Sequence, residues 1–473
     1  MDNLLLVLYL LSFLLISTYS ILNFKSKGLC LDTFFLFLII LYYLFVPINL
    51  LVFGSELYDP NSRKYLYPTL NYVSFESLFA TLLFLSFYIL GTKINFKKKL
   101  AYPLKVYTLM VGKVTIYKIL CRTFTILSLL SLLIYINQFG GLLQAIILTQ
   151  AVRSGYGYEM TDSPYLFVKE FIPLSLITIA LYTWQKRETI IDNICFYTSW
   201  LVISFLYLFL TAGKAAILLL FMLIYFSIVI KNKKYYISIA LLFILGAFVS
   251  LGILDELFIV IAKLTKEDEE LGFGMILRRL ISTILSGELG KGEYLTALDK
   301  SSNKYLETLG YLVHFQVSLN LSLHNNYHLL FVQDFLTALS EFVPDRLLGT
   351  DLDNLPTNVQ MVNTALYRNT YPILPARTEA SVPPGIITYT IYSFSLPGLI
   401  CLSFLWGCFY QFIDRIFKKL IQVRNDFHGI YAFSVIILGF YPIAGIPSFV
   451  IGNKIFVIFF LFLLVSFKLR YVR

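Results

Sequence analysis

The sequence is poor in charge for its length. Asp, Glu, Lys and Arg make up 14% of its 473 residues, whereas 58% are hydrophobic, and the mean hydropathy is +0.76. Soluble domains are about 25% charged, so this scarcity excludes a soluble globular protein. The cationic excess of +10 lies in short segments between apolar runs. That pattern indicates membrane orientation and argues against nucleic acid as a partner.

Cysteine and histidine are also scarce. All five cysteines lie in apolar runs: Cys30, Cys121, Cys195, Cys401 and Cys408. This placement gives no support to a disulfide framework or a Cys-based zinc site. His324 and His328 are four residues apart and can share a helix face, but no Asp or Glu at a diagnostic spacing completes a zinc motif. We therefore expect no metal and no cofactor.

Long apolar runs are what the chain has in abundance, and they predict an all-α polytopic integral membrane protein. Requiring roughly 17–25 mostly apolar residues per span gives about eleven transmembrane helices. They cover Leu4–Leu22, Leu31–Phe53, Tyr72–Gly91, Val114–Ile136, Tyr165–Trp184, Ile194–Leu210, a run from the Thr211–Lys214 break to Ile230, Tyr235–Ile261, Gly385–Phe412, Ile430–Ile443 and Ile455–Phe467. The tenth span is short and can continue through Pro442 as a kinked helix. The N-terminal run lacks a basic n-region and a small-residue cleavage site, which favours a retained first helix over a signal peptide.

A long polar segment divides these runs into three parts. We expect a bundle of about eight spans in residues 1–262, a large, partly helical extracytoplasmic loop in residues 263–384, and about three spans in residues 385–473. Loops of this length inside a compact domain are usually functional or disordered. We therefore expect the functional site in the loop.

Lysine and arginine are concentrated in every second connection between the apolar runs, and this pattern predicts the orientation of the chain in the membrane. One set of connections contains Lys25, Lys27, the Lys93–Lys113 cluster, Lys186, Arg187, Lys231–Lys234, Arg415–Arg424, Lys468, Arg470 and Arg473. The other short connections carry few cations. Because basic short loops stay in the cytoplasm, the C-terminus is predicted cytoplasmic, and the N-terminus and the long loop are predicted outside.

Six cations on the predicted outer side are candidates for binding phosphate. They are Arg153, Lys214, Arg278, Arg279, Arg346 and Arg377. A guanidinium offers planar, bidentate donors to phosphate oxygens, although snorkelling at the interface or membrane-surface anchoring also explains cations in such positions. In residues 273–285 the apolar side chains share one helical face, with Arg278 and Ser282 opposite. This predicts an amphipathic helix that lies on the membrane or docks on the bundle.

Two further residues are candidates for acid–base chemistry. Glu379, near several arginines, would be kept ionised and can accept a proton, although a surface salt-bridge network explains it equally. Histidine is the side chain whose ordinary pKa lies nearest to neutral pH, so His324 is the second candidate base.

Three stretches resemble the Wzy-type polymerases of bacterial O-antigen and capsule repeat units. The stretch FLTAGKAAILLLFMLIY is similar to a junction of the family in which small residues are followed by a basic residue and then by an apolar run. Lys214 stands where arginine is usual. FVPDRLLG resembles its Pro-Arg turn, with Asp345 inserted before Arg346. EASVPPGIITYTIYSFSLPGLI resembles the polar lead-in to the next span, including the step Ser395–Gly398. The order of these stretches along the predicted topology also matches the family.

The resemblance implies an enzyme of the bacterial inner membrane with the site residues named above. It would transfer a growing glycan on undecaprenyl pyrophosphate to the non-reducing end of a lipid-linked repeat unit, on the periplasmic side. Implied partners are these lipid-linked glycans, membrane lipids, a Wzz-type chain-length regulator and a flippase. No nucleotide-sugar site is expected, and no strand–helix unit with a Gly-rich turn is found.

Four alternatives remain open. An O-antigen ligase shares the architecture but passes the glycan to lipid A core. A flippase predicts charges buried within the spans and no large outer loop, whereas these spans are nearly charge-free. A transferase using a lipid-phosphate sugar would place acidic residues in the first outer loop, where Glu56 and Asp59 are the candidates. A non-enzymatic assembly scaffold would make the outer arginines individually dispensable.

Overall fold

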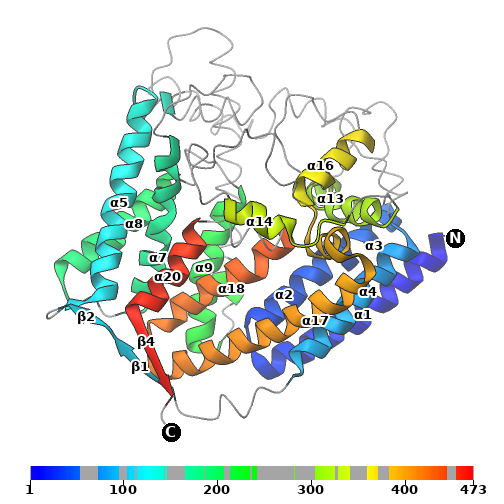
Figure 1. The fold of residues 1–473 in the computed structure, drawn as a ribbon, viewed down its shortest axis with the longest axis horizontal. Coiled ribbons are helices and arrows are strands. Elements are labelled where there is room, and N and C mark those ends of the chain that lie inside the picture. Colours follow the sequence, from blue (N-terminus) through cyan, green and yellow to red (C-terminus); the bar gives the residue numbers. More distant parts are fainter. Residues whose placement is uncertain are drawn as a thin grey trace.

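The computed structural model of the chain is mostly helical (Figure 1). It describes residues 2–53, 73–94, 104–111, 114–142, 144–145, 166–185, 187–206, 214–234, 237–241, 278, 282, 304–324, 329–340, 359–370, 383–444 and 454–471. Within them, five helical stretches are long and apolar enough to cross a membrane, and five shorter apolar helices accompany them. The predicted class of apolar helical protein is therefore confirmed at this level.

The helices follow the predicted spans closely along most of the chain. The apolar runs form α1 (Asp2–Lys27), α2 (Leu31–Ile40), the π-helix η1 (Leu41–Phe45), α3 (Val46–Phe53), α4 (Phe75–Thr92), α5 (Ile116–Gln138), the 3₁₀ helix η3 (Leu166–Leu174), α7 (Ser175–Tyr182), α8 (Ile190–Phe205), α9 (Lys214–Asn232), α17 (Ile386–Val423), α18 (Phe427–Ala444) and α20 (Lys454–Ser466). Helix α18 does continue through Pro442. Most of the predicted span Tyr235–Ile261 lies outside the described residues.

Helix α17 departs from its predicted span in two ways. It continues to Val423, well past the predicted end at Phe412, so Arg415, Lys418 and Lys419 belong to its last turns instead of a loop. It is also broken at Ser395, where φ is 58° and ψ is −152°. The break lies in the Ser395–Gly398 step, and Pro397 there lacks the N–H that a continuous helix would use.

Helices α4 and α17 approach each other to backbone contact. A Cβ atom on Gly91 would overlap the carbonyl oxygen of Phe404, and one on Gly407 would overlap that of Tyr88. Small residues allow two membrane helices to approach to backbone contact. Tyr88 and Tyr410 are fully buried beside this crossing, with ring centroids 6.2 Å apart and nearly perpendicular rings. In contrast, α1 exposes Leu14 and Leu15, as expected for a helix that faces lipid.

Two short antiparallel ribbons close one end of the bundle. Strand β1 (Leu104–Thr108) pairs with β4 (Phe467–Tyr471), so that Lys105 lies opposite Arg470. Strand β2 (Met110–Val111) pairs with β3 (Val114–Thr115). The first ribbon joins the most basic internal connection to the end of the chain, two segments that were predicted to share one side of the membrane.

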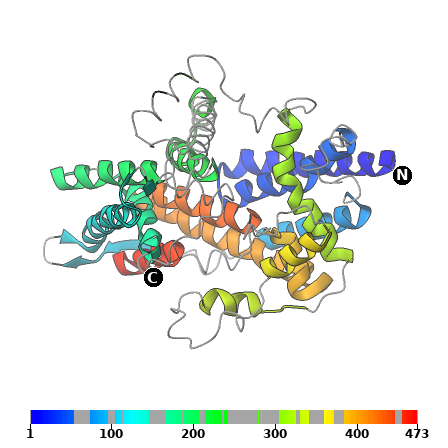
Figure 2. The ribbon, with the colours of Figure 1, turned by 90° about the horizontal axis from the view of Figure 1, so that it is seen from above.

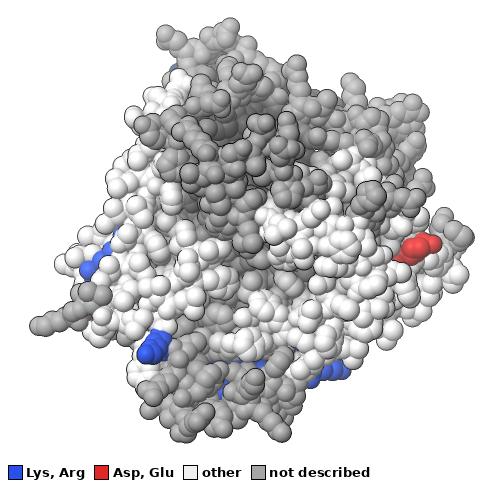
Figure 3. Space-filling view, in the orientation of Figure 1, with Lys and Arg blue, Asp and Glu red and all other residues white. Residues whose placement is uncertain are grey.

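Other contacts gather the basic connections at this same end. Lys231 Nζ lies 3.8 Å from the centre of the Trp184 ring, and the Arg424 guanidinium lies 5.4 Å from that of Phe467. On the face shown in Figure 3, the exposed Lys and Arg of the described part lie mostly in the lower half. This end, called the basic end here, carries the connections that were predicted cytoplasmic.

Three helices of the long loop pack at the opposite end. They are α13 (Lys304–His324), α14 (Gln333–Ser340) and α16 (Val359–Thr370). Helix α13 lies across the group formed by η1, α3 and α4 and also contacts α17 (Figure 2). Leu330, Val359, Tyr389 and Tyr392 form a small core between these helices and the first turns of α17. The described part of the loop therefore folds back onto the bundle.

Candidate functional site

The candidate site is the end of the bundle on which the loop helices pack. One of the two predicted bases lies there. His324 is the last residue of α13, exposed, with Nδ1 3.0 Å from the carbonyl oxygen of Asn320. Its imidazole also interacts electrostatically with Glu76, in the first turn of α4. Glu76 is thus near enough to His324 for an electrostatic interaction, and it was not among the predicted site residues.

Two of the six predicted cations are described. Arg278 and Ser282 are both helical and exposed, as expected for the polar face of the predicted amphipathic helix. Lys214 is the first residue of α9, so it stands at a helix end at the predicted boundary between two spans. Its side chain lies outside the described part of the chain.

The remaining predicted site residues lie outside the described residues. These are Arg153, Arg279, Arg346, Arg377 and Glu379, together with His328 of the histidine pair. The described part of the chain therefore shows His324 and Arg278 in exposed positions but does not bring the predicted catalytic set together.

Buried and part-buried amide and hydroxyl groups join the loop helices to the bundle. Asn363 Nδ2 of α16 donates to Ser318 Oγ of α13 at 3.0 Å, and Tyr392 OH of α17 donates to Asn363 Oδ1 at 3.4 Å. Ser74 Oγ, at the start of α4, donates to Asn320 Oδ1 at 3.4 Å. Because buried polar groups are costly unless hydrogen-bonded, these bonds specify how the loop helices sit on the bundle.

The break in α17 is closed by the loop itself. The backbone N–H of Leu330 donates to the carbonyl oxygen of Tyr392 at 3.1 Å, and that of Phe331 donates to Ser393 at 3.0 Å. In a continuous helix the Ser393 carbonyl would accept from residue 397, but that residue is proline and has no N–H. The segment before α14 therefore supplies the missing donors, and it ties the loop to the Ser395–Gly398 step.

The approach to α14 presents apolar side chains outward. Phe331, Val332 and Leu336 are each more than half exposed. Asp334, in the first turn of α14, is buried instead, and its Oδ1 accepts from the backbone N–H of Val359 at 3.0 Å. A helix with one apolar, exposed face and one docked face is suited to a membrane interface.

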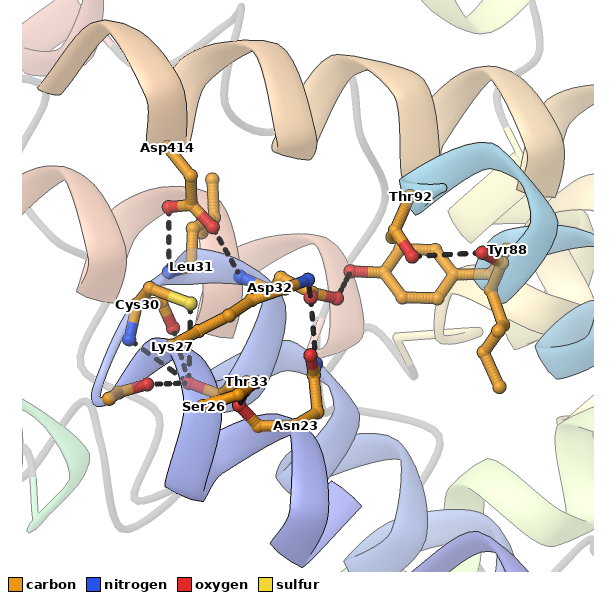
Figure 4. Close-up of polar contacts among 12 residues, drawn as sticks. Asn23, Ser26, Lys27, Cys30, Leu31, Asp32, Thr33, Tyr88, Thr92 and Asp414 are labelled. Atoms are coloured by element: carbon orange, nitrogen blue, oxygen red, sulfur yellow. Dashed lines mark hydrogen bonds and ion pairs between the residues drawn. The ribbon is translucent and has the colours of Figure 1, made fainter. Parts of the chain in front are cut away.

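The opposite, basic end contains a cluster of two buried carboxylates (Figure 4). Asp414 of α17 accepts from the backbone N–H groups of Leu31 (2.9 Å) and Asp32 (3.1 Å), and from Tyr431 OH. It therefore caps the N-terminus of α2, where the helix dipole favours an anion. We call this group, with Asp32 and its partners, the Asp32–Asp414 cluster.

Asp32 itself is fully buried and has three side-chain donors. Lys27 Nζ lies 2.6 Å from Oδ2, Asn23 Nδ2 lies 2.8 Å from the same oxygen, and Tyr88 OH lies 3.0 Å from Oδ1. The cluster thus joins α1, α2, α4, α17 and α18 at one point. Cys30, next to it, is fully buried, and burial raises the pKa of its thiol, so it is not a reactive thiolate.

A third buried carboxylate lies between α5, α7 and α8. Asp192 Oδ1 accepts from Arg122 Nη2 and from Tyr182 OH, each at 3.0 Å. Lys118 Nζ is 3.8 Å from Oδ2, too long for a hydrogen bond, and Oδ2 accepts none from the described residues. We call this group the Asp192 cluster.

Of these carboxylates only Asp32 falls within a predicted span, whereas Asp192 and Asp414 lie just outside Ile194–Leu210 and Gly385–Phe412, in helices that extend beyond those bounds. Asp32, Asp192 and Asp414 are all buried, each near the basic end of its helix. An ionisable residue at the edge of an apolar run is a functional or structural signal, and this was the signal that could have identified them. Their hydrogen bonds show that they hold helices together at that end.

The described residues form a mostly helical fold, with helices long and apolar enough to cross a membrane and loop helices that pack back on the bundle. Comparison with protein-family models, with curated proteins and with solved structures finds no match to this chain. Its function has to be argued from its own residues and contacts.

Proposed function

We propose that this protein polymerises lipid-linked oligosaccharide repeat units outside the cytoplasmic membrane. The observation that supports this most is the docking of the loop on α17. The donors of Leu330 and Phe331 meet α17 beside the Ser395–Gly398 step, one of the motifs on which the resemblance to Wzy-type polymerases depends. The loop helices lie at the end opposite the basic connections, in accord with the predicted topology.

The proposed reaction displaces undecaprenyl pyrophosphate from a sugar. A hydroxyl at the non-reducing end of the incoming repeat unit attacks C1 of the growing chain. The new glycosidic bond forms as the C1–O bond to the pyrophosphate breaks, and the hydroxyl proton passes to a base. Glu379 is the proposed base, with His324 as the second candidate, because a carboxylate and an imidazole are both groups that can take the proton of a reacting hydroxyl.

Outer cations have the second role in this proposal. The leaving pyrophosphate gains negative charge as the C1–O bond breaks, and positioned cations stabilise that charge. Arg153, Lys214, Arg278, Arg279, Arg346 and Arg377 are the proposed donors. The exposed position of Arg278 on a helix is consistent with this role, since an amphipathic helix at the interface lies at the depth of a lipid-linked phosphate.

The test is a glycan ladder from a deletion strain complemented with variants. Arg278→Ala, Arg377→Ala and Glu379→Gln should each abolish long chains and leave the single-repeat glycolipid. Lys418→Ala removes an exposed cation at the basic end and serves as the matched control, with wild-type chain lengths expected. Expression of each variant is checked by immunoblot.

Two results would contradict the proposal. Long glycan chains in all three variants would show that Arg278, Arg377 and Glu379 do not form the proposed site. Loss of every surface glycan in the deletion strain, including the single-repeat form, would indicate a ligase or a flippase.

A further inference from the structure

A cavity of about 490 Å³ lies between three helices at the basic end. Its walls come from the end of α1, the end of α4 and the late turns of α17. The lining residues are Tyr19, Leu22, Asn23, Ser26, Lys27, Thr92, Lys93, Gln411 and Arg415. It lies at the C-terminal end of α4, whereas Glu76, which is near His324, lies in the first turn of that helix, so the cavity is separate from the proposed polymerase site.

The lining is cationic. Lys27, Lys93 and Arg415 are three of the lining residues, and the described lining includes no Asp or Glu. The other polar groups are hydroxyls and amides, which can donate hydrogen bonds without adding charge. Such a set of donors suits an anion with several oxygens.

Each cation is held in place by a neighbour. Lys27 Nζ bonds to Asp32 Oδ2 behind the cavity wall (Figure 4), so the Asp32–Asp414 cluster positions it. Lys93 Nζ lies 5.7 Å from the centre of the Tyr19 ring. With the Gln411 amide oriented to present its oxygen, Arg415 Nη2 lies 2.9 Å from that oxygen. The Tyr19 ring and the Gln411 amide thus hold two cations at the wall of the cavity, in addition to Lys27.

An apolar path leads away from the cations. Leu22 lines the cavity and is 60% exposed, and Leu15, about two turns earlier on α1, is 71% exposed. Apolar side chains exposed along a membrane helix face lipid tails. A ligand with a phosphate in the cavity and hydrocarbon along α1 would match both surfaces.

We propose that this cavity binds a phosphate group, as carried by the headgroup of an anionic membrane lipid. The planar guanidinium of Arg415 and the ammonium of Lys93 contact its oxygens, as these groups do in other phosphate sites. Basic pockets between membrane helices are known to bind phosphorylated headgroups. The same donors would accept soluble pyrophosphate, so the experiment has to separate the two sources.

The test is native mass spectrometry of the full chain in detergent, titrated with phosphatidylglycerol. The double variant Lys93→Gln/Arg415→Gln should bind the lipid at least about tenfold more weakly, because two charge-assisted contacts are lost. The matched control is Lys25→Gln/Lys418→Gln, which removes two exposed cations of the same end that do not line the cavity. It should bind as the wild type does.

A second titration identifies the source of the phosphate. Under the proposal, added pyrophosphate reduces the amount of lipid bound to the wild type. It should not reduce the lipid bound to the Lys93→Gln/Arg415→Gln variant. A lipid that binds more tightly than pyrophosphate identifies the headgroup as the ligand, and the reverse order identifies a soluble phosphate. Phosphatidylcholine, which is zwitterionic, should bind more weakly than phosphatidylglycerol.

The inference fails if both double variants and the wild type bind phosphatidylglycerol equally. Should Lys93→Gln/Arg415→Gln not fold, Lys93→Gln alone replaces it, because Lys93 is exposed and terminates α4. Unchanged lipid binding in that variant, with unchanged pyrophosphate competition, also overturns the proposal. The outcome is independent of polymerase activity, since the readout is bound lipid.

Discussion

The Asp32–Asp414 cluster and the Asp192 cluster stabilise buried carboxylates in different ways. Both hold a buried carboxylate near the basic end of a helix, and both use a tyrosine hydroxyl at 3.0 Å, from Tyr88 and Tyr182 respectively. Asp414, however, is held by the N–H groups of a helix N-terminus and a hydroxyl, whereas Asp192 is held by the cations Arg122 and Lys118.

The difference matters for how each cluster responds to change. The backbone N–H groups at a helix N-terminus have fixed directions, so they cannot move with a displaced carboxylate. Long cationic side chains, in contrast, can rotate towards water when their partner is removed. The hydrogen bond between Asp32 and Asp414 joins residues that are 382 positions apart in the sequence. The bond between Arg122 and Asp192 joins residues that are only 70 positions apart. The Asp32–Asp414 cluster should therefore contribute more to the stability of the whole bundle.

The largest effect should come from Asp414→Ala. It leaves the N–H groups of Leu31 and Asp32 and the Tyr431 hydroxyl without their acceptor in a buried site. Loss of a helix cap and of hydrogen bonds to a charged group predicts a destabilisation of roughly 2–4 kcal/mol. Thermal melting in detergent, followed by size-exclusion chromatography, measures it. Asp414→Asn keeps one acceptor and should fall between this variant and the wild type.

Asp192→Ala should destabilise less, by about 1–3 kcal/mol. Arg122 is 26% exposed, so its guanidinium can be hydrated once Asp192 is gone. A double-mutant cycle with Arg122→Ala isolates the pair. If Asp192→Ala lowers the melting temperature more than Asp414→Ala does, the proposed difference between dipoles and cations is wrong.

The apolar runs predicted most helix bounds well, because membrane helices are set by length and hydropathy. Leu31–Phe53 is an example: its bounds coincide with the start of α2 and the end of α3. The C-terminal end of α17 was missed because Asp414, Arg415 and Lys418 suggest a loop. In the structure they remain helical, with Asp414 turned inward and Lys418 outward.

The candidate site was less predictable. His324 was selected for its chemistry, and the structure places it on an exposed helix end. Its neighbour Glu76, and the closure of the α17 break by Leu330 and Phe331, depend on contacts between segments far apart in the chain. Hydropathy and charge patterns carry no information on such pairing. The Asp32–Asp414 contact was missed for the same reason.

The smallest effects, and the finest test of the comparison, come from the two tyrosines. Tyr88→Phe and Tyr182→Phe each remove one hydroxyl that donates to a buried carboxylate, and each should cost about 1 kcal/mol. Tyr88→Phe should cost more, because Asp32 then depends on Lys27 and Asn23, which both bond to its other oxygen. After Tyr182→Phe, Arg122 still donates to the same oxygen of Asp192. Melting temperatures of the two variants, measured in one detergent, decide the order, and equal losses would mean that the cations of the Asp192 cluster do not compensate for the missing hydroxyl.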